Sequence, residues 1–212
     1  MIHNTLFLAI MMMICSCAST QSTTDNQKLM AEQAQPVQEL PYRQIPETPE
    51  EFTAEKLAAR MIDGLGYRYY WSTELLKPED LQYKITEEAR TMEETMGHVH
   101  GLSKTILNGV LIKPNVRSAN QKEMSWVELR AATLNNLKQA SDILRNAGSG
   151  DIENYKIIFQ RGDKSSEFPF WNMINGPISD ALWHTGQIVS FRRAAGNPIP
   201  PGVNVLTGKT FE

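Results

Sequence analysis

In the stretch GPISDALWHTGQIVSFRRAAGNP, Gly176 to Pro198, a polar pair interrupts an apolar, helix-like run, and its role decides between an enzyme and a helical domain without an assignable function. The run ends at a glycine and a proline, which are typical of a helix C-terminus. Asp180 and His184 are four residues apart, so on a helix they project from the same face. The pair therefore supplies two ligands of a metal site, or else it is the polar edge of a packed helix, where Ser179 or Asp180 only caps the helix.

Three earlier segments also predict helices. The first covers residues 53–76, the second opens with a capping box at Thr91, and the third opens with another at Ser125. Long connections follow the second and third helices. Within the later connection the run Tyr155–Phe159 predicts a short strand, and the rest is expected to be loop. These patterns predict an all-α fold, a four-helix bundle with long crossover loops between helices 2–3 and 3–4.

The N-terminus predicts an export signal. Its apolar run is too short to span a bilayer, and it leads into Ile14-Cys15-Ser16-Cys17. This end resembles the lipobox of bacterial lipoproteins, which implies cleavage after Ser16 and a lipid on Cys17. The resemblance also implies sorting to the outer membrane where the host has two membranes. A plain signal peptide with incidental cysteines is the alternative.

Composition then divides the chain of 212 residues into three parts. Residues 1–16 are the expected signal peptide, residues 17–52 a lipidated and flexible tether rich in Gln, Thr, Pro and Glu, and residues 53–212 the helical domain. Both cysteines lie in the leader region, so disulfides and a cysteine nucleophile are excluded from the domain. The net charge of −3 gives no electrostatic basis for binding nucleic acid.

Three histidines lie beyond the leader: His98, His100 and His184. His98 and His100 are two residues apart, about 200° around a helix, so they cannot face the same ion. One inward histidine on the second helix could join Asp180 and His184 as the third ligand of an ion in the core of a bundle. Two imidazoles and a carboxylate leave positions open for water or substrate, as catalytic zinc or iron sites require.

Two motifs resemble those of a known family. Residues 179–188, SDALWHTGQI, are similar to the fourth-helix motif of the DinB-like metalloproteins, a His-x-x-x-His pair followed by x-Gly-Gln. Residues 91–98, TMEETMGH, resemble that family's second-helix motif. The resemblance covers about residues 53–196 and implies a DinB-like bundle whose metal ligands are His98, Asp180 and His184.

One departure from the family pattern bears on the metal. Asp180 stands where the family has a histidine. A carboxylate is a harder donor than imidazole and adds negative charge. The implied ion is a divalent metal, zinc first, with iron, manganese and nickel also admissible.

Two polar residues could support such a site. Glu94 shares the face of His98 and is a candidate catalytic residue, as a partner of the histidine or a proton acceptor. Its alternative role is the capping box with Thr91. Gln187 lies close to His184 on the helix and could orient a ligand or simply bond a loop.

Aromatic and basic residues receive plainer interpretations. The cluster at residues 67–71, together with Trp183, is assigned to the core, although one ring could line a pocket. Arg192 and Arg193 in the last turn suit the helix dipole as a solvated helix end. Binding an acidic group of a substrate is the alternative for these two arginines.

The sequence therefore predicts an extracytoplasmic, lipid-anchored metalloenzyme, a hydrolase that acts through a metal-bound water on a small-molecule substrate. Its expected partners are that substrate and the membrane, through Cys17, with no nucleic acid; pairing into a homodimer is also open. The alternatives are a non-catalytic metal- or ligand-binding lipoprotein, a scaffold without metal, and a metal-dependent thiol S-transferase, an activity found in the resembled family.

Overall fold

The computed structural model describes residues 39–116 and 123–211. The expected signal peptide, Cys17 and most of the expected tether lie outside the described residues. Within the described ranges, every helix is too short or too polar to cross a lipid bilayer.

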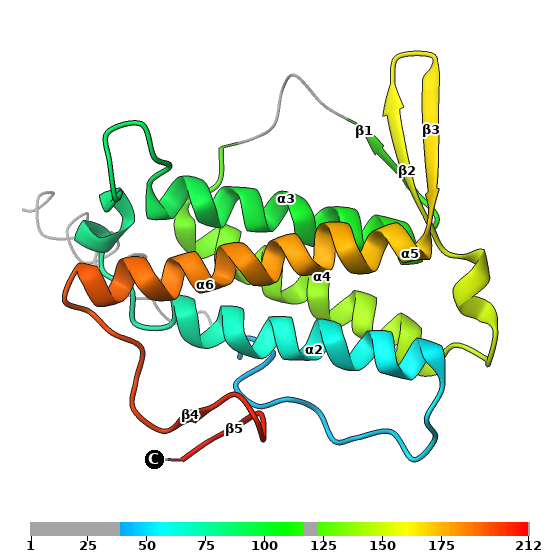
Figure 1. The fold of residues 1–212 in the computed structure, drawn as a ribbon, viewed down its shortest axis with the longest axis horizontal. Helices are drawn as coiled ribbons and strands as arrows, with labels where there is room; N and C mark the ends of the chain where they lie inside the picture. Colours follow the sequence, from blue (N-terminus) through cyan, green and yellow to red (C-terminus); the bar gives the residue numbers. More distant parts are fainter. Residues whose placement is uncertain (1–38, 117–122, 212) are drawn as a thin grey trace, which may run out of the picture. The chain divides into compact units, whose positions relative to one another are not determined.

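Four long helices make up most of the described chain: α2 (Ala54–Thr73), α3 (Met92–Val110), α4 (Trp126–Asn146) and α6 (Ser179–Ala194). Both α2 and α3 pack against α4 and also against α6 (Figure 1). The predicted starts are confirmed, because Thr53 caps α2 and capping boxes open α3 at Thr91 and α4 at Ser125.

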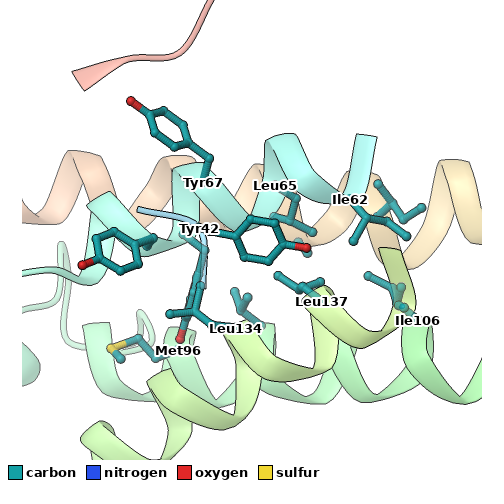
Figure 2. Close-up of a cluster of buried hydrophobic side chains, with 14 of the residues drawn as sticks. Tyr42, Ile62, Leu65, Tyr67, Met96, Ile106, Leu134 and Leu137 are labelled. Carbon is teal, nitrogen blue, oxygen red and sulfur yellow. The ribbon is translucent and has the colours of Figure 1, made fainter. Parts of the chain in front are cut away.

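A single apolar core lies between these helices. Figure 2 shows buried side chains from three of them, Ile62 and Leu65 of α2, Ile106 of α3, and Leu134 and Leu137 of α4. All five are fully buried. Each helix therefore contributes one apolar face to a shared interior, which is how amphipathic helices are stabilised in globular domains.

A three-stranded sheet departs from the predicted all-α class. The strands are β1 (Pro114–Val116), β2 (Lys156–Arg161) and β3 (Lys164–Pro169), in the order β1-β2-β3. β1 runs parallel to β2, and β2 and β3 form an antiparallel hairpin that extends away from the helices (Figure 1). The prediction of a mainly helical fold is thus confirmed, but the predicted all-α class left out this sheet.

Only one strand of the hairpin was predicted, because the two strands differ in burial. β2 matches the expected strand at residues 155–159, whereas β3 lies in sequence that was expected to be loop. Every residue of β3 is exposed, so it carries no apolar alternation to reveal it. Its pairing follows from a two-residue turn, with Gly162 at φ 58° as the first turn residue. A second small sheet pairs β4 (Val203–Asn204) with β5 (Lys209–Thr210).

Short helical segments connect these elements. They are the 3-10 turns η1 (Pro78–Gln82) and η2 (Asp151–Asn154), the short helix α5 (Phe170–Met173), and the π-helical turn η3 (Ile174–Ile178). α5 and η3 lead directly into α6, and the helical path kinks at Gly176.

Residues 40–47 belong to the folded unit, although they were expected to be part of the tether. Tyr42 is only 4% exposed, and its hydroxyl donates to Asp63 on α2 over 3.1 Å. Gly66 makes room for the ring, because a Cβ there would lie 2.4 Å from it. The folded unit therefore begins at Leu40. A few apolar residues among prolines form too short a pattern to predict this packing.

Arg192 joins α6 to the end of α2. Its side chain is 1% exposed and donates to the carbonyl oxygens of Trp71, Ser72 and Glu74 over 2.8–3.2 Å. These carbonyls lie at the C-terminus of a helix, where the helix itself supplies no donor. Arg192 is thus a buried capping group rather than the solvated helix end that was expected, whereas Arg193 is exposed.

We expect Arg192→Ala to lower the free energy of unfolding by about 3 kcal/mol, because several buried carbonyls lose their donor at about 1–3 kcal/mol each. Urea denaturation measures this change. The matched control is Arg193→Ala, an exposed change expected to stay within about 0.5 kcal/mol of wild type. Equal stability of the two variants would contradict the capping role.

Candidate metal site

The structure brings the three predicted ligands together. His98 lies in the second turn of α3, and Asp180 and His184 lie in the first two turns of α6, the helix packed against it. One potential ligand atom from each residue lies within 4.8 Å of the other two. Among the described residues, this is the group of acidic and histidine side chains whose geometry suits an ion.

The carboxylate of Asp180 lies between the two imidazoles. Its Oδ2 is 3.3 Å from Nε2 of His98, and its Oδ1 is 3.3 Å from Nε2 of His184. The rings meet edge to face with their centroids 4.5 Å apart. Neighbouring donors bound to one ion at bonds of about 2.0–2.2 Å are roughly 3 Å apart. The donor types and the spacing therefore fit a divalent metal ion.

Gln187 sets the orientation of His184. Its Oε1 is 2.6 Å from Nδ1 of His184, one turn along the same helix. An amide oxygen accepts, so Nδ1 is the donor of this bond, and in the neutral ring Nε2 carries the lone pair. Of the two roles considered for Gln187, orienting a ligand is the one that this contact supports.

This arrangement has an electrostatic consequence. The lone pair on Nε2 of neutral His184 faces a carboxylate oxygen of Asp180, and two acceptors repel each other. A metal ion between them converts this repulsion into attraction. The contact between Asp180 and His184 therefore favours a bound metal cation.

The site is open to solvent. The side chains of His98, Asp180 and His184 are 33%, 41% and 16% exposed, so a water or a substrate can reach an ion held there. Partial burial lowers the pKa of His98 below its ordinary value, helped by the charges of His184 and Arg90 and opposed by Asp180. The neutral imidazole is the form that binds metals.

The start of α6 shows that neither Ser179 nor Asp180 caps this helix. α5 and η3 lead into α6 across a break at Gly176, whose backbone angles are not helical, and Ser179 and Asp180 lie within α6, which no side chain caps. The hydroxyl of Ser179 donates back to the carbonyl of Ile174 over 2.7 Å. The alternative in which Ser179 or Asp180 only caps the fourth helix is therefore wrong. Such π-helical turns are often found at functional sites.

Glu94 is exposed and engaged at the start of α3. Its Oε2 accepts from the backbone N–H of Thr91 over 2.8 Å, and the hydroxyl of Thr91 accepts from the N–H of Glu94. This is the capping box that was the alternative to a catalytic role. The catalytic role of Glu94 stays a prediction.

His100 points away from the three ligands, as its spacing from His98 predicts. Its Nδ1 is 3.4 Å from the hydroxyl of Thr133 on α4. Burial lowers the pKa of His100, with a smaller effect of Lys104 in the same direction. His100 is therefore a natural control for the ligand histidines.

Sequence reasoning misplaced one aromatic residue and missed one basic residue. Tyr67, Tyr69 and Trp71 are buried as expected, but Trp183 is 73% exposed. Arg90 is exposed and close enough for its charge to act on His98. Nothing in the spacing of Arg90 indicates this, because it lies in the loop before α3.

Comparisons of the chain with models of protein families, with curated proteins and with solved structures gave no match. The interpretation of this site therefore rests on its own geometry and chemistry.

We expect Gln187→Ala to weaken metal binding about 10- to 100-fold, because partners that orient a ligand histidine usually contribute this much. Titration of the metal-free protein, followed by calorimetry, measures the affinity. The control is Gln160→Ala, since Gln160 is an exposed residue of β2. An affinity equal to that of the control would show that Gln187 does not orient His184.

Proposed function

We propose that the protein is a metal-dependent hydrolase whose divalent ion is held by His98, Asp180 and His184. The observation that carries the proposal is the contact of one carboxylate with two imidazole nitrogens, each at 3.3 Å. A set of two histidines and one carboxylate leaves further positions of the ion open, which distinguishes catalytic from closed structural sites.

Zinc is the first choice of ion, and iron, manganese and nickel are also compatible with this donor set. The ion would lower the pKa of a coordinated water and so supply a nucleophile at neutral pH. The protein's own residues would keep an open coordination position of the ion available to water and substrate. Gln187 holds His184 in one tautomer, and the partial exposure of Asp180 leaves the site open to a substrate.

We also propose that the domain is a DinB-like four-helix bundle. Three features support this: four long helices in the expected order, long connections after α3 and α4, and ligands on α3 and α6 at the positions of the family's motifs. The strands β1 to β3 lie within those two connections.

Export and a lipid on Cys17 complete the proposal. They rest on the lipobox-like sequence alone. An extracytoplasmic location would favour a hydrolase over a thiol S-transferase, since low-molecular-weight thiols are expected to be scarce there. A non-catalytic metal-binding lipoprotein is the other function that the same site supports.

Metal analysis tests the site, on protein purified without chelators and without a metal-binding tag. We expect about one divalent ion per chain in the wild type, and less than about a tenth of that in His98→Ala, Asp180→Ala and His184→Ala, because each loses one of three ligands. His100→Ala is the matched control, because His100 faces Thr133 instead. Equal metal content in all four variants would contradict the proposed metal site.

Activity separates the hydrolase from a metal-binding protein. Metal-loaded wild type is assayed on ester, amide and phosphoester substrates, and we expect chelation to abolish hydrolysis and the ion to restore it. Stoichiometric metal with no hydrolysis of any substrate would leave the binding protein as the function.

A further inference from the structure

Trp183 is a large exposed residue at the edge of the candidate metal site. It is 73% exposed, although tryptophan is strongly buried on average. It directly precedes His184 and lies one turn after Asp180 in α6, an uninterrupted helix from Ser179 to Ala194. Residues three positions apart on a helix have Cβ atoms about 5–6 Å apart. The side chain of Trp183 therefore starts beside that of Asp180.

The buried residues of α6 show on which side of the site Trp183 lies. Viewed down the helix, the buried residues Ala181 and Ile188 lie about 80–100° around from Asp180 in one direction. Trp183 lies about 60° around from Asp180 in the other direction. Trp183 therefore borders the outer side of the three ligands, away from the core.

The neighbouring helix α3 carries no side chain at two positions on its own outer side. The buried residues Val99 and Ile106 lie about 80–100° around from His98 toward the core. Gly97 and Gly101 lie about 60–100° around from His98 in the opposite direction. A Cβ at either glycine would have no heavy atom within 4 Å. Open space therefore lies over the α3 backbone beside His98.

The two glycines beside His98 differ from other glycines in the helices. A Cβ at Gly66 would lie 2.4 Å from the ring of Tyr42, and a Cβ at Gly109 would lie 2.0 Å from the side chain of Met173. Those glycines make room for packing, whereas the two beside His98 do not. Glycine inside a helix is destabilising relative to alanine, and it is found where a ligand approaches the backbone closely. A ligand that approaches α3 next to the metal site would account for them.

We infer that the indole of Trp183 packs against a flat apolar ring of the substrate, next to the group held at the metal ion. This rests on the proposed function, and it names the substrate class of the hydrolase as compounds with an aromatic or similarly flat ring beside the cleaved bond. Aromatic rings attract each other in offset or edge-to-face arrangements. The open space over Gly97 and Gly101 admits such a ring, while the open positions of the ion take the reacting group.

Charged residues near this side of the site do not select a charged substrate. Glu94 is exposed and lies one turn before His98, and the charge of Arg90, also exposed, acts on His98. These two opposite charges offset each other. The shape of the open space and the apolar indole of Trp183 therefore define the preferred group.

Two hydroxamates test this inference on the full, metal-loaded chain, because both bind a metal ion through the same pair of oxygens. Benzohydroxamate carries a phenyl ring and acetohydroxamate a methyl group. We expect calorimetry to show that wild type binds benzohydroxamate about tenfold more tightly, and that Trp183→Ala reduces this advantage to about twofold, because ring packing contributes about this much. Trp183→Phe should largely retain it. Acetohydroxamate should bind all three proteins equally, because Trp183 is not a ligand of the ion.

Two further variants serve as control and converse. Trp171→Ala is the matched control, since Trp171 is 78% exposed but lies in α5. In α5, Met173 lies against Gly109, which is about 16 Å along α3 from His98. Trp171→Ala should therefore keep the tenfold advantage. Gly101→Leu fills the open space with a good helix former, so it should remove the advantage without loss of metal.

The outcomes separate this inference from the proposed function. A chain that holds no metal would contradict the metal site and the inference that rests on it. Metal-loaded protein with the same ring advantage in wild type and Trp183→Ala, or with unchanged binding in Gly101→Leu, would overturn the inference alone. A ring advantage without hydrolysis of any ring-bearing ester or amide would support the role of Trp183 and contradict the hydrolase. A wild-type dimer that Trp183→Ala converts to a monomer would overturn the inference and assign the indole to a second copy.

Discussion

The carboxylate of Asp180 lies between two imidazole nitrogens, and the proposed chemistry depends on this contact. The contact joins α3 to α6, and it brings together two acceptors, Oδ1 of Asp180 and Nε2 of neutral His184, which repel each other unless a cation lies between them. The surrounding protein keeps them together. Gln187 fixes the ring of His184, and the packing of α6 against α3 places Asp180 beside His98. The arrangement is therefore a property of the fold, not of three mobile side chains.

The same packing depends on a second polar interaction at the far end of α6. Arg192 supplies donors to the carbonyls that end α2, so α6 is fixed to α2 at its C-terminus while its N-terminal half faces α3. A buried arginine without partners would be strongly unfavourable, so the position of α6 relative to α2 is tightly constrained. Stability at one end of α6 thereby supports the geometry of the ligands at the other.

Much of the architecture could be predicted because its signals are local. Thr91 and Ser125 begin their helices through capping boxes that are visible in the sequence, and the spacing of Asp180 and His184 sets their common face. What could not be predicted depends on distant partners. Tyr42 is buried only because Gly66 admits its ring, and β3 pairs through a turn rather than through its own apolar pattern. Trp183 was assigned to the core because it is a large aromatic residue, yet on α6 its side chain faces solvent.

X-ray absorption spectroscopy of the metal-loaded protein can identify the ligands of the ion, since it reports the donors around it. We expect two imidazole nitrogens and at least one carboxylate oxygen in the first coordination shell, at about 2.0–2.2 Å. Asp180→Asn should change the oxygen contribution, and His98→Ala should remove one imidazole. A coordination shell of oxygen alone, unchanged in both variants, would show that His98, Asp180 and His184 do not hold the ion.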